Sequence, residues 1–158
     1  MVNTQKVKNL GFVENLRIFI MKYIKSCGFI VYKIVSDKLL FLVIGSKNGD
    51  VGFPKGHIEK DETEIQTAFR ELKEETNLEV EVIEGYRYQI EYKLKHIKNA
   101  IKQSVYFLGY AKNDNIICQP EEVNFAKFVS FDEALKVLTY KETKDILTKA
   151  KDFLENKK

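Results

Sequence analysis

Residues 56–78 read GHIEKDETEIQTAFRELKEETNL, and the second half of this stretch has the pattern of an amphipathic helix. Four apolar residues recur there at offsets 0, 3, 4 and 7: Ile65, Ala68, Phe69 and Leu72. This spacing puts them on one face and predicts a helix over residues 63–76. Thr63 or Asp61 can cap its start, and acidic residues in the first turn suit the positive end of the helix dipole.

The same helix carries three glutamates on a second face. Glu71, Glu74 and Glu75 stand at offsets 0, 3 and 4, so their carboxylates are neighbours and repel one another. Such repulsion costs a few tenths of a kcal/mol per pair, and a divalent cation with oxygen ligands would remove it. The alternative is a solvated charged face that binds nothing. We favour a metal site.

The whole stretch resembles the signature of the Nudix hydrolases, G-x5-E-x7-R-E-U-x-E-E-x-G-U, in which U is a bulky apolar residue. Gly56, Glu62 and residues 70–78 match every fixed position but one. The exception is Asn77, where the signature has glycine. That position follows the helix end and should be left-handed, a conformation that asparagine tolerates better than most residues.

Composition bounds the rest of the chain. Its 158 residues are 44% hydrophobic, which supplies one sizeable core. The net charge of +3 is only a weak hint of anionic partners. Cys27 and Cys118 form no CxxC and suggest reduced thiols, and no apolar run approaches the ~18 residues that cross a membrane. We expect a cytoplasmic, monomeric protein with an N-terminal extension of no assigned chemistry, residues 1–20, and one domain, residues 21–158.

Periodicity predicts further strands and helices on both sides of the 56–78 stretch. The expected strands are 25–33, 38–46, 79–84, 86–92, 103–111 and 126–130, and the expected helices after the first are 131–139 and 141–155. An irregular loop, 51–59, should lead into the first helix. Strands flanked by helices predict an α/β fold, an α/β/α sandwich around a mixed β-sheet. This architecture is similar to the Nudix fold.

The flanking residues resemble one Nudix subfamily, the asymmetrical bis(5′-nucleosyl)-tetraphosphatases. Residues 53–59 read FPKGHIE, a tyrosine-containing strand follows at 85–92, and a basic loop precedes the strand after it. The resemblance implies that Mg²⁺ or Mn²⁺ is held by Glu71, Glu74 and Glu75, with the carbonyl of Lys55 or Gly56 and a further ligand or base from Glu122. It also implies that Arg70 orients a carboxylate of the signature through a bidentate pair.

The resemblance assigns the substrate-binding side chains as well. Lys55 suits a phosphate as a point charge. Tyr92 and Tyr140 match positions at which the subfamily stacks adenine, although half-buried packing is the ordinary role of such tyrosines. Lys102 or Lys98 matches a phosphate-contacting lysine, and His57 either contacts phosphate or shapes its loop.

The resemblance implies a metal-dependent hydrolase of small nucleotides. Water attack near one end of diadenosine tetraphosphate would give ATP and AMP. Other substrates of the fold are open alternatives, namely RNA 5′-pyrophosphates and diphosphoinositol polyphosphates, and so is a nucleotide sensor without turnover. We expect no membrane partner and no stable nucleic-acid partner, because the chain lacks a long basic face.

Overall fold

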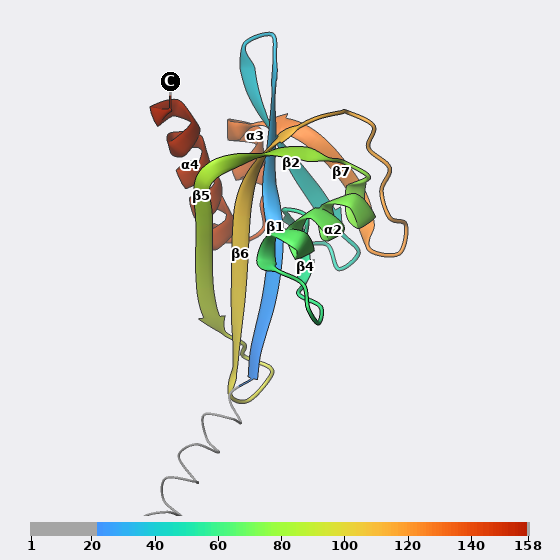
Figure 1. Cartoon of the computed structure of the whole chain (residues 1–158), viewed down its shortest axis with the longest axis vertical. Helices are drawn as coiled ribbons and strands as arrows, with labels where there is room; N and C mark the ends of the chain where they lie inside the picture. The colour runs from blue at the N-terminus through green and yellow to red at the C-terminus, as the bar shows by residue number, and fades with distance from the viewer. Residues whose placement is uncertain (1–21, 158) are drawn as a thin grey trace, which may run out of the picture.

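The structure, a computed structural model, describes residues 22–157. The predicted extension, residues 1–20, lies outside them. Within this range, Figure 1 shows a twisted sheet with helices on both sides. The elements in chain order are β1 (Lys22–Val35), β2 (Lys38–Ser46), β3 (Val51–Gly52), β4 (Lys55–His57), α2 (Glu64–Thr76), β5 (Val80–Lys93), β6 (Ala100–Ala111), β7 (Val123–Ser130), α3 (Phe131–Val137) and α4 (Lys141–Asn156).

The sheet is mixed, as predicted. Its main path runs β3-β2-β1-β6-β5, with β4 paired to β1 and β7 paired to β2. The central pair, β1 with β6, is parallel from Lys22 opposite Ala100 to Tyr32 opposite Tyr110. All other pairs are antiparallel. The two-residue turn at Ser36 and Asp37 closes the β1–β2 hairpin with φ of 49° and 63°.

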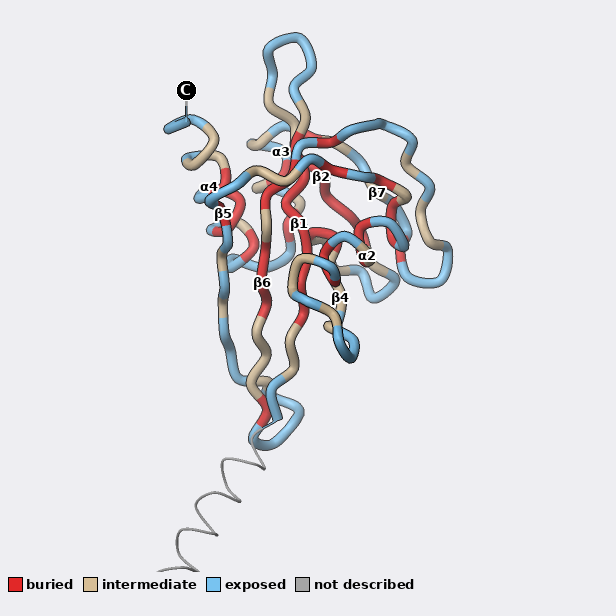
Figure 2. Tube along the Cα trace, viewed as in Figure 1, coloured by how far each residue is buried: buried red, intermediate tan, exposed pale blue. Residues whose placement is uncertain are grey.

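Two cores cover the two faces of the sheet. One contains Tyr106 and Leu147 and lies between the sheet, α3 and α4. The other contains Phe29 and Leu72 and lies between the sheet and α2. Figure 2 shows the buried segments concentrated in the upper part of the central strands. The predicted α/β/α sandwich is therefore confirmed.

Local signals fix both ends of α2. Thr63 is the N-cap, and its side chain accepts a hydrogen bond from the Gln66 amide while the Gln66 side chain accepts one from the Thr63 amide. At the other end Asn77 is left-handed, with φ 64°, and its amide donates to the Lys73 carbonyl at 2.9 Å. The predicted cap and the predicted conformation of Asn77 are both confirmed.

Two predicted boundaries were wrong. The expected strands 79–84 and 86–92 are one strand, β5, because Gly85 adopts φ 86° and lets the strand bend without ending. The register against β6 shifts across this bend, between Val82 and Arg87. The expected irregular loop, 51–59, contains β3 and β4, because its backbone pairs with β2 and β1.

Other strands are longer than predicted. β1 and β6 each begin three residues earlier, because the parallel pairing continues to Lys22 and Ala100. Of the two cysteines, Cys27 is buried and both are free. No helix in residues 22–157 is long and apolar enough to cross a membrane.

Candidate active site

Two glutamates of α2 are buried against β4. Glu71 is 9% exposed and Glu75 is 5% exposed. β4 is fixed here because Gly56 pairs with Cys27 of β1. The approach is so close that a Cβ atom at Gly56 would lie 2.0 Å from the Glu71 carboxyl carbon. Glycine at this position therefore lets the backbone of β4 reach the carboxylate face of the helix.

Arg70 organises the rim of this acidic cluster. Its Nε and Nη2 donate to the two oxygens of Glu62 at 2.7 and 2.9 Å, a bidentate pair. Its Nη1 donates to Glu71 at 2.8 Å and to Glu74 at 3.2 Å, and Nη2 also donates to the His57 carbonyl at 3.1 Å. One guanidinium thus ties the loop before α2 to two carboxylates of the helix.

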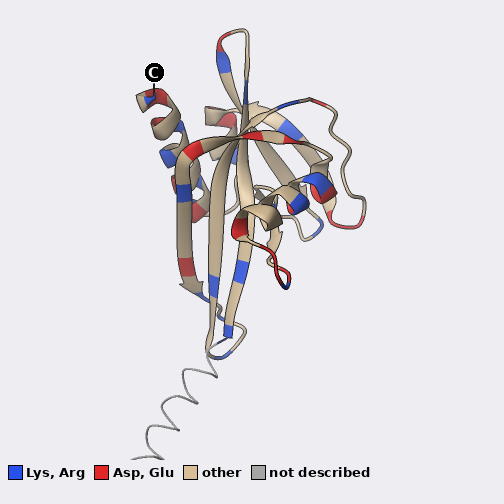
Figure 3. Cartoon of the chain, in the orientation of Figure 1, with Lys and Arg blue, Asp and Glu red and all other residues tan. Residues whose placement is uncertain are grey.

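Burial and mutual repulsion disfavour the charged form of both buried glutamates. Burial, with the added charges of Glu71 and Glu122, raises the pKa of Glu75 to about 9, while the Lys55 backbone amide opposes the rise. Burial likewise raises the pKa of Glu71, against the opposing effect of Arg70. Glu122 precedes β7 and is exposed, so a segment far along the chain brings a third carboxylate to the cluster. Figure 3 shows acidic residues on α2 and on the loop that leads into it.

These residues fit a hard cation chemically. The Glu75 Oε2 atom is buried and has no hydrogen-bond partner in the structure, and such an atom is costly unless it is paired. In the described part of the chain, however, no three His, Cys, Asp or Glu side chains are grouped to hold a metal ion as they stand. Arg70 engages both Glu71 and Glu74, whereas Glu75 is buried. The predicted metal-ligand set remains a prediction.

Lys55 and Lys102 lie on the other face of the sheet from Glu71. Adjacent residues of a strand point to opposite faces, and the Lys55 ammonium is 5.9 Å from the ring centroid of Tyr106, in the core beside α4. Burial lowers the pKa of Lys102, and the charge of Lys55 lowers it further, so the two ammonium groups are near each other. They form a compact positive pair on that face.

Two tyrosines lie near this lysine pair. Tyr92 on β5 stands opposite Lys102 in the register with β6. Tyr140, the N-cap residue of α4, donates its hydroxyl to Asp50 at 2.8 Å. This hydrogen bond raises the pKa of Tyr140, with a smaller contribution from the charge of Tyr92. We call the four side chains Lys55, Lys102, Tyr92 and Tyr140 the aromatic–lysine row.

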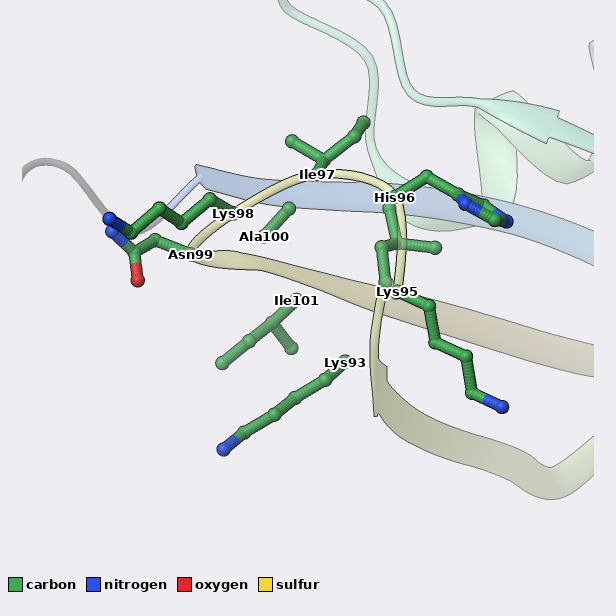
Figure 4. Close-up of a pocket in the computed structure, with 9 residues that line it drawn as sticks. Lys93, Lys95, His96, Ile97, Lys98, Asn99, Ala100 and Ile101 are labelled. Atoms are coloured by element: carbon green, nitrogen blue, oxygen red, sulfur yellow. The ribbon is translucent and has the colours of Figure 1, made fainter.

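The two other predicted substrate residues are His57 and Lys98. His57 is exposed, and its backbone carbonyl, rather than its imidazole, contacts Arg70. Lys98 lies in the loop after β5, where residues 93–101 line a pocket of about 490 Å³. Figure 4 shows Lys98 pointing to the opposite side of that loop from Lys95 and His96.

Two residues of the site were absent from the predicted set. Glu62 belongs to the signature, and its fixed distance of eight residues from Arg70 is the signal that could have identified the pair. Asp50 had no such signal, because its contact with Tyr140 joins residues 90 positions apart. Only the tertiary structure brings it to the row.

Comparisons with known proteins find similar sequences and similar structures. A family profile described as NUDIX domain matches residues 28–150. The asymmetrical bis(5′-nucleosyl)-tetraphosphatase of Mus musculus is 27% identical over 143 residues, covering 83% of this chain and 95% of that protein. The Caenorhabditis elegans enzyme of the same name is 29% identical over 134 residues, covering 83% and 96%.

Solved structures give the same result. A C. elegans Ap4A hydrolase binary complex superposes with a TM-score of 0.76 at 27% identity, covering 84% of this chain and 98% of that one. The NUDIX domain of Shewanella oneidensis NrtR, in complex with ADP ribose, has a TM-score of 0.67 at 18% identity and supports the fold alone.

Proposed function

The chain belongs to the Nudix family, and from this premise we propose that it hydrolyses diadenosine tetraphosphate asymmetrically to ATP and AMP with Mg²⁺ or Mn²⁺. The similarity to the mouse and nematode tetraphosphatases, at 27% and 29% identity, supports this choice of substrate. The observation that carries the proposal is the pair of buried glutamates, Glu71 and Glu75, held against the backbone of β4.

The acidic cluster would hold the cation. Glu71, Glu75 and Glu74 would supply carboxylate oxygens, with the Gly56 carbonyl completing the set. A bound divalent cation neutralises phosphate oxygens and lowers the pKa of water. The partnerless Oε2 of Glu75 supports this assignment, because a cation would satisfy an atom that the protein leaves unpaired.

Two further residues would accept the proton of the attacking water and position a carboxylate ligand. We assign Glu122 as the general base, because it is exposed, free of Arg70, and near enough for its charge to raise the pKa of Glu75. Arg70 would hold Glu71 in place through its 2.8 Å hydrogen bond, with Glu62 fixing the guanidinium.

The aromatic–lysine row would bind the substrate. Lys55 and Lys102 would neutralise the phosphate chain, and Tyr92 and Tyr140 would stack an adenine. Both tyrosines are accessible, with 40% and 53% of their surface exposed. In the reaction a water oxygen bonds to the phosphorus next to one adenosine, its proton passes to Glu122, and the bridging P–O bond breaks so that ATP leaves and AMP remains.

The test is product analysis by ion-exchange chromatography after incubation with diadenosine tetraphosphate and Mg²⁺. We expect ATP and AMP in equal amounts, and no products in EDTA or with Glu75→Gln. Glu81→Gln, an exposed change on β5, is the matched control and should retain activity. An intact dinucleotide beside trimmed 5′-triphosphorylated RNA would refute the substrate assignment, and no turnover of either would refute hydrolysis.

A further inference from the structure

The turn between β2 and β3 is closed tightly around Asp50. The Asp50 amide donates to the Asn48 side-chain oxygen at 2.9 Å. The Asp50 carbonyl accepts from the Ser46 amide at 2.8 Å and from the Ser46 hydroxyl at 3.0 Å. Three hydrogen bonds thus fix the backbone of Asp50 relative to the sheet on both sides of the residue.

The same turn is attached to the start of α4. The Val51 amide donates to the Thr139 hydroxyl at 2.8 Å, and the Thr139 amide donates to the Val51 carbonyl at 3.1 Å. The third link is the hydrogen bond from the Tyr140 hydroxyl to Asp50 Oδ2 at 2.8 Å. We call these four residues, Asp50, Val51, Thr139 and Tyr140, the latch.

The backbone and the ring of Tyr140 are held by different contacts. Its backbone is already fixed, because the Tyr140 carbonyl accepts from the Thr143 hydroxyl at 2.7 Å and α4 packs into the core through Ile146 and Leu147. Its ring is 53% exposed and takes part in none of the aromatic pairs found within residues 22–157. The hydrogen bond to Asp50 is therefore the contact that restrains the orientation of the ring.

We propose that Asp50 is a positioning residue that presents the ring of Tyr140, through its hydroxyl, in the orientation needed to stack a nucleobase of the substrate. This inference rests on the proposed function of the row. Stacking requires a flat face at a fixed angle, and an exposed ring restrained in advance loses less conformational freedom on binding. Asp50 itself needs no contact with the substrate, because its negative charge and those of the phosphates repel each other.

Kinetics with diadenosine tetraphosphate separate positioning from chemistry. Asp50→Ala and Tyr140→Phe should each raise KM about tenfold, because a ring that is no longer restrained must be ordered when the base stacks on it, while kcat stays within twofold. The double variant should be no worse than either single variant, because both remove the same bond. Asp50→Asn keeps an oxygen acceptor and should restore KM to within threefold of the wild type. Asp145→Ala, an exposed change on α4, is the control.

A spectroscopic measurement tests the latch without turnover. With ¹³Cζ-labelled tyrosine, the Tyr140 resonance, assigned from Tyr140→Phe, should titrate at lower pH in Asp50→Ala than in the wild type. AMP should shift this resonance in the wild type and need about tenfold higher concentration to do so in Asp50→Ala. Additive KM effects, or an AMP response that is the same in both proteins, would overturn the proposal. Failure of the proposed function has a different signature, namely an intact dinucleotide with the wild-type protein.

Discussion

The substitution Gly56→Ala tests the closest approach in the site. The new Cβ atom would lie 2.0 to 2.3 Å from the three carboxylate atoms of Glu71, whereas ordinary contacts begin at 3.4 Å. The carboxylate must therefore move by at least about 1.4 Å, the difference between 2.0 and 3.4 Å. Because these atoms end a flexible side chain, the carboxylate can move while the strand stays paired. We expect a folded protein with a displaced Glu71.

The kinetic consequence follows from that displacement. A shift of about 1 Å in a positioned catalytic group can cost about 100-fold in rate, so kcat/KM on diadenosine tetraphosphate should fall at least 100-fold in Gly56→Ala. Gly52→Ala is the matched control, because a Cβ there meets no atom within 4 Å, and it should stay within threefold of the wild type. Thermal unfolding of both variants verifies the fold. Activity of Gly56→Ala within threefold of the wild type would refute the proposed role of the Glu71 carboxylate.

Three further predictions concern stability. The pKa of Glu75 is raised to about 9 in the folded protein. The stability that this shift contributes is therefore fully present below the pKa of Glu75 in the unfolded chain and is lost as the pH rises through 9. In EDTA the melting temperature should decline over this window, and Glu75→Gln should remove that part of the decline. Hydrogen bonds from Arg87 and Lys25 lower the pKa of Glu64 to about 2. The stability that Glu64 contributes is therefore present above about pH 4.5 and is lost toward pH 2. Arg87→Gln should destabilise the protein by about 1 kcal/mol at pH 7, after allowance for solvent screening, but not at pH 2, as measured by urea unfolding; an equal loss at both pH values would contradict the assignment. Asn77→Gly should raise the free energy of unfolding by about 0.5 kcal/mol and Asn77→Ala should lower it by about 1 kcal/mol, because φ is 64°; the reverse order would be inconsistent with a left-handed cap.

The parts of the structure that the sequence predicted are those with local causes. The helix at 63–76 followed from its apolar spacing, from Thr63 as cap and from a residue after its end that tolerates a left-handed conformation. The clustering of glutamates on one face followed from the same period. No local signal distinguished one strand of 14 residues from two short ones, because Gly85 reads as a break and acts as a bend.

The site shows the same division between local and distant causes. Glu71 and Glu75 were identified from their helical spacing, whereas their burial depends on the approach of Gly56 from another strand. The contact of Tyr140 with Asp50 could not be predicted, since it depends on where α4 begins relative to the turn after β2. Lys98 was named as the alternative to Lys102 for a phosphate-contacting lysine, and the direction of its side chain (Figure 4) depends on a loop whose conformation the sequence does not determine locally.

The parallel pairing of β1 with β6 has a kinetic consequence. Its partners, such as Lys22 and Ala100, are separated by 78 residues, whereas β1 and β2 are joined by a two-residue turn. Closing a long loop costs entropy before any contact repays it. We therefore expect the β1–β2 hairpin to form early. The pairing of β1 with β6 should form late, as the rate-limiting step of folding. Pulse-labelling hydrogen exchange would show amides of the β1–β2 pair protected before those of the β1–β6 pair, and simultaneous protection of both would contradict this order.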